Sequence, residues 1–123
     1  MTLTKTVLTI DDSKSVRDMV AFALQPEGYT VVQAEDGSKG LDQLRSVSPQ
    51  LVITDLNMPV MDGISFIEAA RKDPKGTGVP IIMLTTETSP DMKARGKAAG
   101  ATGWIDKPFD PAKLVAVAKK LLG

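Results

Sequence analysis

Residues 51–59 read Leu-Val-Ile-Thr-Asp-Leu-Asn-Met-Pro, and this stretch points most directly to the fold of the chain. Residues 51–54 form an almost unbroken apolar and β-branched run, which is typical of a parallel strand covered on both faces. Asp55 follows at once, and Asn57 and Pro59 are residue types that favour turns. The stretch therefore predicts a buried strand that ends in an acidic side chain.

Runs of the same kind recur along the chain and alternate with segments of helical periodicity. The expected strands are residues 6–10, 29–32, 51–54, 81–84 and, with a weaker pattern, 103–105. The apolar positions at helical spacing are Val16, Met19, Val20, Ala23 and Leu24; Leu41, Leu44 and Val47; Ile64, Ile67 and Ala70; Met92, Ala98 and Ala99; and Leu114, Val117, Ala118, Leu121 and Leu122. Five strand–helix alternations predict right-handed crossovers and one parallel sheet with helices on both faces, which is a doubly wound α/β fold.

Capping and breaking residues mark the helix boundaries. Pro26 and Gly28 end the first helical segment, while Ser89-Pro90 and Asp110-Pro111 each place a capping side chain before a proline at the first helical position. The helix that follows Ser89 has a thin apolar stripe, so we expect it to be the least firmly packed helix.

The composition excludes several classes of function. The chain has 123 residues, 42% of them hydrophobic and 24% charged, which is enough for one globular domain with an ordinary core. Lys and Arg number 15, as do Asp and Glu, so the chain lacks the basic excess of a nucleic-acid-binding protein. There is no Cys for thiol chemistry and no His to act as a general base or metal ligand. No apolar run approaches the roughly 20 residues that span a bilayer, and we expect a cytoplasmic protein without a membrane partner.

Polar residues stand at the carboxyl ends of four of the expected strands. Asp11-Asp12 follows the first strand, Asp55 the third, Thr85-Thr86 the fourth, and Lys107-Pro108 comes shortly after the fifth. In a doubly wound sheet, ligands bind outside the carboxyl ends of the strands. We therefore expect these side chains to form one site.

The residue types at this expected site suit phosphoryl transfer assisted by a metal ion. Three carboxylates in one cleft repel each other, and Mg²⁺, which prefers oxygen ligands, would relieve that repulsion. Lys107 can pair with a carboxylate or a phosphoryl oxygen, and the Thr85 hydroxyl can donate to another such oxygen. Because Cys and His are absent, the nucleophiles at hand are carboxylates and hydroxyls, and attack by Asp55 on phosphorus would give an aspartyl phosphate.

Each of these residues also has a plain structural interpretation. Asp11-Asp12 can cap the helix that follows, Asp55 can belong to a turn, Thr85-Thr86 can lie in a loop, and Lys107 can be a solvated charge. For any one position alone, that interpretation is the better one. Because all four positions fall at strand ends on one edge of one sheet, their coincidence favours a functional site.

Four segments resemble the signature segments of bacterial response-regulator receiver domains of the CheY-like kind, in the same order. They are Thr9-Ile10-Asp11-Asp12-Ser13, Thr54-Asp55-Leu56-Asn57-Met58-Pro59, Leu84-Thr85-Thr86 and Lys107-Pro108-Phe109. The resemblance extends from Val7 to Leu122. It implies a flavodoxin-like parallel sheet of order 2-1-3-4-5 with five helices, in a single receiver domain over residues 1–123 without an output domain.

The resemblance also implies a role for each site residue. Asp55 would be the phosphoacceptor, Thr85 would hydrogen-bond the phosphoryl group, and Lys107 would pair with it. The Lys107–Pro108 peptide bond would be cis. The implied Mg²⁺ ligands, direct or through water, are Asp11, Asp12, Asp55 and the backbone carbonyl of Asn57. The protein would be a phosphoacceptor switch that catalyses its own phosphorylation and dephosphorylation, and not an enzyme acting on a separate substrate.

Further residues fall at positions that transmit or tune the signal in the family. Phosphorylation draws the threonine inward, here Thr85, and an aromatic residue of the last strand follows it, here Trp104. Trp offers only an N–H donor, so a switch through a Tyr hydroxyl cannot be copied intact, and Trp104 is either a moving switch or a fixed anchor. Thr86 is a further switch candidate, and Asn57 and Glu87 match a pattern that predicts a short-lived acyl phosphate.

Three functions are compatible with these residues. The favoured one is a monomeric chemotaxis regulator, which takes its phosphoryl group from a histidine kinase and binds the flagellar motor switch through the last strand and last helices. The second is a shuttle or phosphate sink that serves another histidine protein. The third is a metal-dependent phosphatase with Asp55 as nucleophile. It is disfavoured because such enzymes often carry a general acid two residues later, where this chain has Asn57.

Overall fold

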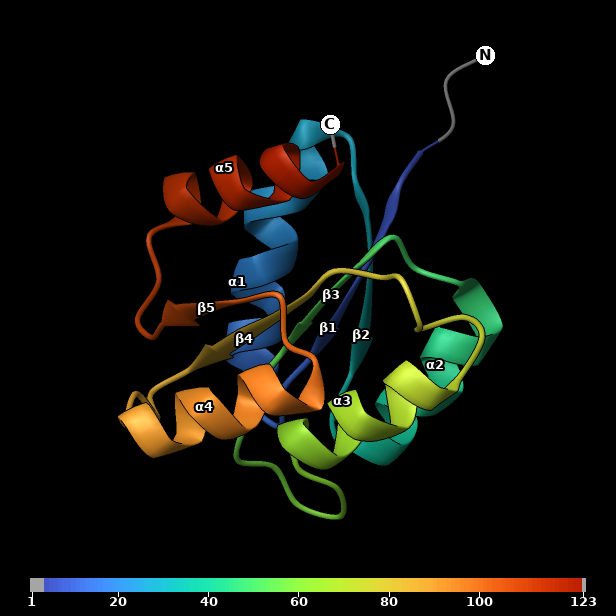
Figure 1. The fold of residues 1–123 in the computed structure, drawn as a ribbon. Coiled ribbons are helices and arrows are strands. Elements are labelled where there is room, and N and C mark those ends of the chain that lie inside the picture. Colours follow the sequence, from blue (N-terminus) through green and yellow to red (C-terminus); the bar gives the residue numbers. More distant parts are fainter. Residues whose placement is uncertain (1–3, 123) are drawn as a thin grey trace.

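The computed structural model describes residues 4–122, which form a five-stranded parallel sheet between two layers of helices (Figure 1). The strands are β1 (Thr6–Ile10), β2 (Thr30–Ala34), β3 (Leu51–Thr54), β4 (Ile81–Thr85) and β5 (Gly103–Asp106). The helices are α1 (Lys14–Leu24), α2 (Gly37–Val47), α3 (Gly63–Lys72), α4 (Pro90–Ala99) and α5 (Pro111–Leu122), with a short 3₁₀ helix η1 (Gln25–Glu27) after α1. The predicted alternation of strands and helices is confirmed.

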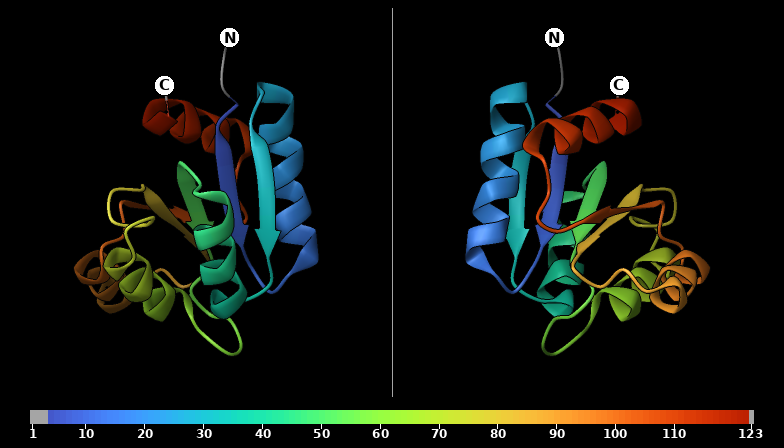
Figure 2. Two further views of the ribbon diagram at one scale, coloured as in Figure 1. Left: turned by 90° about the vertical axis from the view of Figure 1, so that its right-hand side faces the viewer. Right: turned by 90° about the vertical axis from the view of Figure 1, so that its left-hand side faces the viewer.

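The strand order is β2-β1-β3-β4-β5, and every neighbouring pair is parallel, as the flavodoxin-like resemblance implied. Helices α1 and α5 cover one face of the sheet, and α2, α3 and α4 cover the other (Figure 2). The chain runs outward from β1 to β2 and then returns past β1 to β3, so the strand order reverses at β1. The loops after β1 and β3 therefore leave the sheet in different directions, at the place where ligands bind in such folds.

Two apolar clusters, one on each face of the sheet, make up the core. Successive strand residues point to opposite faces, so Leu8 and Ile10 pack toward α2 and α3, whereas Val7 packs toward α1 and α5. Every residue of β3 and β4 is buried, which explains why their apolar runs are continuous and not alternating. The central strands are thus held from both sides, and their carboxyl ends are fixed in space.

Capping contacts confirm the predicted helix starts. The Ser89 hydroxyl accepts a hydrogen bond from the Met92 backbone N–H at 3.3 Å, and Asp110 Oδ1 accepts one from the Ala112 N–H at 2.9 Å. Gly28 adopts a φ of 95° after η1, a left-handed conformation that glycine tolerates without strain. In α4, Gly96 is the only buried residue, so this helix is the most weakly packed, as its thin stripe predicted.

Met19 corrects one expectation for α1. We placed it in the apolar stripe of that helix, but its side chain is 46% exposed. The residues of α1 that are buried are Val20, Ala21 and Leu24, and the face they form leaves Met19 at its solvent-facing margin. The neighbouring Phe22 is exposed as well, at 76%.

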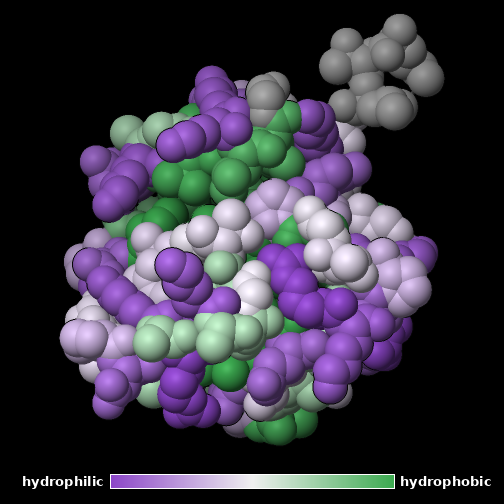
Figure 3. Space-filling view, in the orientation of Figure 1, coloured by the Kyte–Doolittle hydropathy of each residue, from purple (hydrophilic) through white to green (hydrophobic). Residues whose placement is uncertain are grey.

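The surface seen in Figure 3 is mostly hydrophilic. A hydrophobic strip lies over α5 at the upper end, and a small hydrophobic spot marks the β3–α3 loop at the lower end. Among residues 4–122, no helix combines the length and the apolar character that a membrane span needs.

Candidate functional site

Three carboxylates meet at the carboxyl edge of the sheet. Asp11 and Asp12 follow β1 and Asp55 follows β3, and one oxygen of each lies within 4.8 Å of the others. Asp11 and Asp55 are buried, with 2% and 8% of their surfaces exposed, whereas Asp12 faces solvent. The structure therefore brings together the acidic residues that the sequence placed at two separate strand ends.

Lys107 enters the same site from the loop after β5. Its Nζ lies 2.7 Å from Asp11 Oδ2 and 3.2 Å from Asp55 Oδ2, so one ammonium group bridges the two buried carboxylates. The backbone N–H of Lys107 donates to the Thr85 carbonyl at 3.0 Å, which ties this loop to the end of β4. The Lys107–Pro108 peptide bond is cis, as expected.

Asp11 is held through its backbone and through its side chain. Its N–H donates to the Ala34 carbonyl of β2 at 3.0 Å, and its own carbonyl accepts from Arg17 Nη1 at 2.7 Å. Oδ1 accepts from the Ser13 N–H at 2.9 Å, and Oδ2 accepts from Lys107. These contacts leave the Asp11 carboxylate with one defined orientation, toward Asp55.

Asp55 is fixed by contacts with β1, with its neighbours at the end of β3 and with the start of α3. Its N–H donates to the Ile10 carbonyl at 2.9 Å, and Oδ1 accepts from the Leu56 N–H at 2.7 Å. The Thr54 hydroxyl donates to the Asp55 carbonyl at 2.9 Å. Gly63 at the start of α3 packs so closely that a Cβ there would lie 2.1 Å from the same carbonyl oxygen. A side chain at position 63 would therefore displace the segment that carries Asp55.

The charges in the site are unbalanced. Three carboxylates face one lysine, so the cluster carries an excess of negative charge in a largely buried place. Burial raises the pKa of Asp11 above its ordinary value, and the bond from Lys107 only partly offsets this effect. Burial acts to lower the pKa of Lys107, but the hydrogen bond to Asp11 and the charges of Asp55 and Asp11 outweigh it, and the pKa is raised. The site thus favours the binding of a further cation.

The donor set fits a hard divalent cation. Mg²⁺ binds through one or a few carboxylates and retains several water molecules, which suits two buried carboxylates beside an exposed one. Asp11, Asp12 and Asp55 are the residues that would hold it. When bound, the ion would offset the excess negative charge and accept an oxygen of an incoming phosphoryl group.

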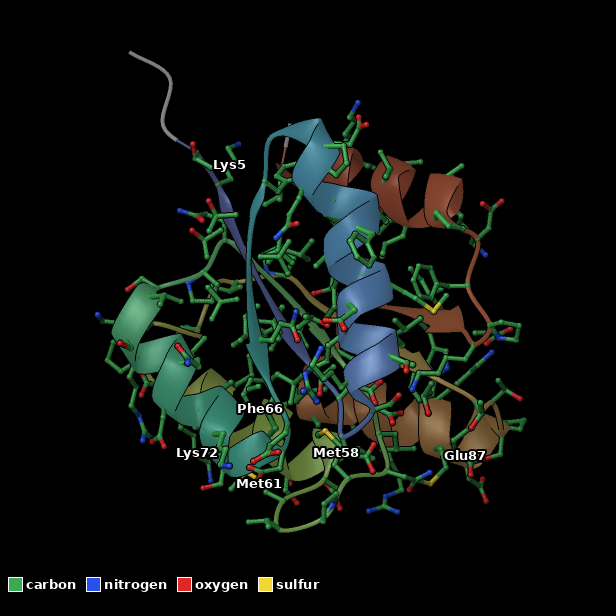
Figure 4. The ribbon with its side chains drawn as sticks, turned by 180° about the vertical axis from the view of Figure 1, so that it is seen from behind. Lys5, Met58, Met61, Phe66, Lys72 and Glu87 are labelled. Atoms are coloured by element: carbon green, nitrogen blue, oxygen red, sulfur yellow. The ribbon has the colours of Figure 1, made fainter. Side chains whose placement is uncertain are left out.

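The other predicted site residues lie around this cluster. Thr85 is buried at the end of β4, and its hydroxyl oxygen accepts from the Glu87 N–H at 3.1 Å. Thr86 and Asn57 are exposed, and Glu87 is half-buried. Figure 4 shows that Glu87 and the β3–α3 loop, marked by Met58 and Met61, lie at the same end of the molecule. All of them therefore line or border the carboxyl edge of the sheet.

Trp104 is turned inward in this structure. It packs against the core cluster on the α2–α3 face, and its Nε1 is buried without a hydrogen-bond partner. The indole lies against Gly96 of α4, where a Cβ would come within 2.9 Å of Trp104 Cζ3. The absence of a side chain at position 96 provides the space that the indole fills.

Sequence reasoning missed Arg17 and Gly63. Arg17 reads as an ordinary polar position of an amphipathic helix, and nothing in its spacing indicates a bond to the Asp11 carbonyl. Gly63 reads as the first residue of a helix after the capping Asp62. One signal could have identified Gly63. It begins a helix directly after the loop that follows Asp55, and glycine is favoured where two backbone segments approach closely.

Comparison with known proteins relates the chain to one family. The model of the response regulator receiver domain matches residues 7–119. The DNA-binding response regulator MtrA of Mycobacterium tuberculosis is 37% identical over 115 residues, which are 94% of this chain and 49% of that protein. The phosphate regulon transcriptional regulatory protein PhoB of Pseudomonas aeruginosa is 36% identical over 118 residues, which are 96% of this chain and 52% of that protein. The chain spans about half the length of these curated relatives.

A solved structure is similar over its entire length. The chemotaxis response regulator CheY4 of Vibrio cholerae superposes with a TM-score of 0.91 and 45% sequence identity, and the match covers 98% of this chain and all of CheY4. The similarity thus includes the sheet, the five helices and the carboxyl edge that carries the acidic cluster.

Proposed function

The chain belongs to the response regulator receiver family of two-component systems, and from this premise we propose that it is a switch phosphorylated on Asp55 with the help of Mg²⁺. The observation that carries the proposal is the meeting of Asp11, Asp12 and Asp55 within 4.8 Å, with Lys107 Nζ 3.2 Å from Asp55 Oδ2. A nucleophile, a place for a metal ion and a fixed cation thus lie in one site.

The proposed chemistry uses the Asp55 carboxylate as the nucleophile. One carboxylate oxygen attacks the phosphorus of a phosphohistidine, an O–P bond forms as the N–P bond breaks, and the released imidazole takes up a proton. These 123 residues contain no His, so the donor lies outside them, as a phosphohistidine or a small phosphodonor. Mg²⁺ would neutralise charge on the transferred group, while the protein positions the acceptor.

Lys107 and Thr85 have supporting roles in this proposal. Lys107 already contacts Asp55, and it would follow the new charge onto the phosphoryl oxygens. The Thr85 hydroxyl proton is free to point into the site, because the Thr85 oxygen accepts its present hydrogen bond from Glu87. The protein is then a phosphoacceptor that hydrolyses its own acyl phosphate. Asn57 and Glu87, which border the site, would set the lifetime of that bond.

For the output we propose a chemotaxis role, with the flagellar motor switch as the partner. The support is the 45% identity to the chemotaxis regulator CheY4 over all of that chain, higher than the 37% identity to MtrA. The contact surface would comprise α4, β5 and α5, because Trp104 of β5 lies against Gly96 of α4, and a movement of the indole on phosphorylation would alter this face.

Intact-mass measurement tests the chemistry. The protein is incubated with a small phosphodonor with and without Mg²⁺, and Asp55→Asn serves as the control. We expect one phosphoryl addition of about 80 Da that requires Mg²⁺ and is absent from the variant. Addition to the Asp55→Asn variant, or equal addition without Mg²⁺, would contradict the proposed site.

Binding measurements test the output. We expect the phosphorylated form to bind a flagellar motor switch protein at least tenfold more tightly than the unphosphorylated form. A phosphate sink behaves differently: it loses its phosphoryl group to a second histidine protein and shows no gain in affinity for the motor component. Equal affinity of both forms for the motor switch would exclude the chemotaxis role.

A further inference from the structure

We propose that Arg17 is a positioning residue for the acidic cluster, which it serves by fixing the peptide unit between Asp11 and Asp12. Its effect on metal binding rests on the proposed function, whereas its effect on the geometry of Asp11 and Asp12 does not. Arg17 lies in α1, six residues after Asp11 in the chain, and is only partly exposed.

The decisive contact joins Arg17 Nη1 to the carbonyl oxygen of Asp11 at 2.7 Å. That carbonyl belongs to the peptide unit whose N–H is that of Asp12, so one hydrogen bond sets the plane from which both side chains depart. On the other side of Asp11, its N–H donates to the Ala34 carbonyl of β2 at 3.0 Å. The two bonds together hold the backbone of Asp11 from both ends.

A network of hydrogen bonds between side chains holds the Arg17 guanidinium in place. Arg17 Nε donates to Gln33 Oε1 of β2 at 3.0 Å, and Gln33 Nε2 donates to Asp18 Oδ1 at 3.3 Å. Lys14 in turn pairs with Asp18 Oδ2 at 2.7 Å. Figure 4 shows α1 beside β2, with the first turn of α1 at the same end of the molecule as Met58 and Glu87. The network thus runs from the solvent-facing side of α1 and β2 to the acidic site.

The bonding pattern of Arg17 indicates a geometric role. Within residues 4–122, Arg17 forms no ion pair, and the acceptors that it contacts are a backbone carbonyl and a side-chain amide. Lys107, by comparison, contacts two carboxylates directly and supplies the charge of the site. Arginine suits the geometric task because its planar guanidinium offers several donors in fixed directions.

Loss of this bond changes the cluster in a defined way. Without Arg17 no donor among residues 4–122 remains for the Asp11 carbonyl, and the Asp11–Asp12 peptide unit can rotate, which alters the spacing of the two carboxylates. Partners that orient metal ligands in this manner typically contribute about 10- to 100-fold to metal affinity. We therefore expect Arg17→Met to weaken Mg²⁺ binding about tenfold.

Two measurements on the full chain test the inference. Calorimetric titration gives the Mg²⁺ affinity, and backbone amide chemical shifts in the absence of metal report the geometry of residues 11–13. Arg45→Met is the matched control, because Arg45 forms an exposed ion pair with Asp73 near the opposite end of α2. We expect the largest shift changes of Arg17→Met at residues 11–13, and less than a twofold change in affinity for the control.

Gln33→Leu provides a second variant that leaves Arg17 itself intact. It removes the support of the guanidinium, so we expect a smaller loss of affinity, about threefold, and no further loss when it is added to Arg17→Met. This variant decides the matter should Arg17→Met fail to fold. Unchanged Mg²⁺ affinity in both variants would overturn the inference.

The wild-type protein separates the inference from the proposed function. If it binds no Mg²⁺, the proposed function fails, and the amide shifts alone decide on Arg17. Changes concentrated at residues 11–13 would then support the positioning role, and changes spread evenly over α1 would overturn it.

Discussion

At the residue scale, the site places ionised carboxylates where burial acts against them. Asp11 is 2% exposed, and its pKa is raised by burial despite the bond from Lys107. The folded state therefore holds its proton more tightly than the unfolded chain. As the pH rises from the ordinary value of 3.8 through the folded pKa, the unfolded state loses this proton first, and stability falls. At neutral pH the ionised Asp11 lowers the stability of the metal-free protein.

Because the ionised Asp11 lowers the stability at neutral pH, we predict that Asp11→Asn stabilises the metal-free protein at pH 7. Asn keeps an oxygen for the Ser13 N–H, and Lys107 keeps Asp55 as an ionic partner. Urea unfolding should show a higher midpoint at pH 7, and the gain should shrink as the pH falls toward 3.8. Asp12→Asn, at an exposed position, is the control. A gain that does not change with pH would contradict the electrostatic explanation.

Val60 has a strained backbone conformation. Its φ is 70°, in the left-handed region that a β-branched residue rarely adopts, and the Met61 N–H donates to the Pro59 carbonyl at 2.7 Å across it. This is the pattern of a classic γ-turn, which is strained. The side chain is 83% exposed, so no packing compensates for the strain.

We predict that Val60→Asn raises the free energy of unfolding by about 1 kcal/mol, because Asn tolerates a positive φ and little burial is lost. Urea denaturation measures the gain. Val60→Ala, which retains a Cβ without the polar group that favours this conformation, should gain less. The explanation by strain is wrong if Ala stabilises as much as Asn.

At the scale of elements, α4 packs weakly on the sheet, with Met92 and Ala99 only partly buried against the core. Gly96 is its only buried residue, and the Trp104 indole of β5 fills the space beside it. Gly→Ala in a helix normally gains up to about 1 kcal/mol, but here the new Cβ would lie 2.9 Å from Trp104 Cζ3. The indole would have to move outward.

We therefore predict that Gly96→Ala fails to stabilise the protein and shifts the emission of its single Trp to longer wavelength. In a Trp104→Phe background, where the smaller ring leaves room, the same change should gain about 1 kcal/mol. Circular dichroism in urea compares the two backgrounds. An equal gain in both would show that the indole does not restrict position 96.

Arg71 links three segments at the opposite edge of the sheet. Its guanidinium donates to the carbonyls of Val79 at 2.6 Å, Gly76 at 2.7 Å and Gly100 at 2.6 Å, and so joins α3 to the loops before β4 and after α4. These contacts are partly buried, and a buried backbone carbonyl without a hydrogen-bond donor costs free energy.

We predict that Arg71→Met lowers the free energy of unfolding by about 2–3 kcal/mol, because several carbonyls lose their donor at once. Arg71→Lys should restore less than half of this, since one ammonium group cannot reach all three sites. Arg45→Met, which removes an exposed ion pair, should cost at most about 0.5 kcal/mol. Equal losses for Arg71→Met and Arg45→Met, in thermal or urea unfolding, would refute the role of the carbonyl contacts.

At the scale of the whole molecule, the sequence predicted what depends on local patterns. The runs at 6–10 and 51–54 gave the limits of β1 and β3, because every residue of both strands is apolar or β-branched. The second strand was predicted at 29–32 but lies at Thr30–Ala34. The hydrophobic pattern stops before the polar Gln33, whereas the observed strand continues to Ala34 because residues 30–34 pair with β1.

Contacts between distant segments lay beyond such reasoning. Lys107 and Asp11 are separated by 96 positions in the chain, and only the topology of the sheet brings them to 2.7 Å. The sequence could place both residues at the same edge, but it could not show that Lys107 bridges Asp11 and Asp55. The hydrogen bonds from Arg17 and Arg71 to backbone carbonyls could not be predicted either. Every residue carries a backbone carbonyl, so the residue type does not indicate which carbonyl accepts the bond.

The convergence of β1 and β3 on one edge leads to a prediction about the entire fold. Asp11 and Asp12 follow β1 while Asp55 follows β3, so an ion bound by these residues would bind the folded state and not the unfolded chain. Mg²⁺ should therefore stabilise the protein by mass action. At a concentration ten times its Kd, the free energy of unfolding should rise by about 1.4 kcal/mol.

Urea unfolding over a series of Mg²⁺ concentrations measures this gain, and NaCl at matched ionic strength controls for screening. Asp11→Asn supplies the sharper test, because the same change should raise stability without metal and abolish most of the gain with it. The two effects have one cause, since the negative charge that lowers the stability of the metal-free protein is the charge that would bind the ion. If Asp11→Asn gained as much from Mg²⁺ as the wild type, the ion would be acting somewhere other than at this edge of the sheet.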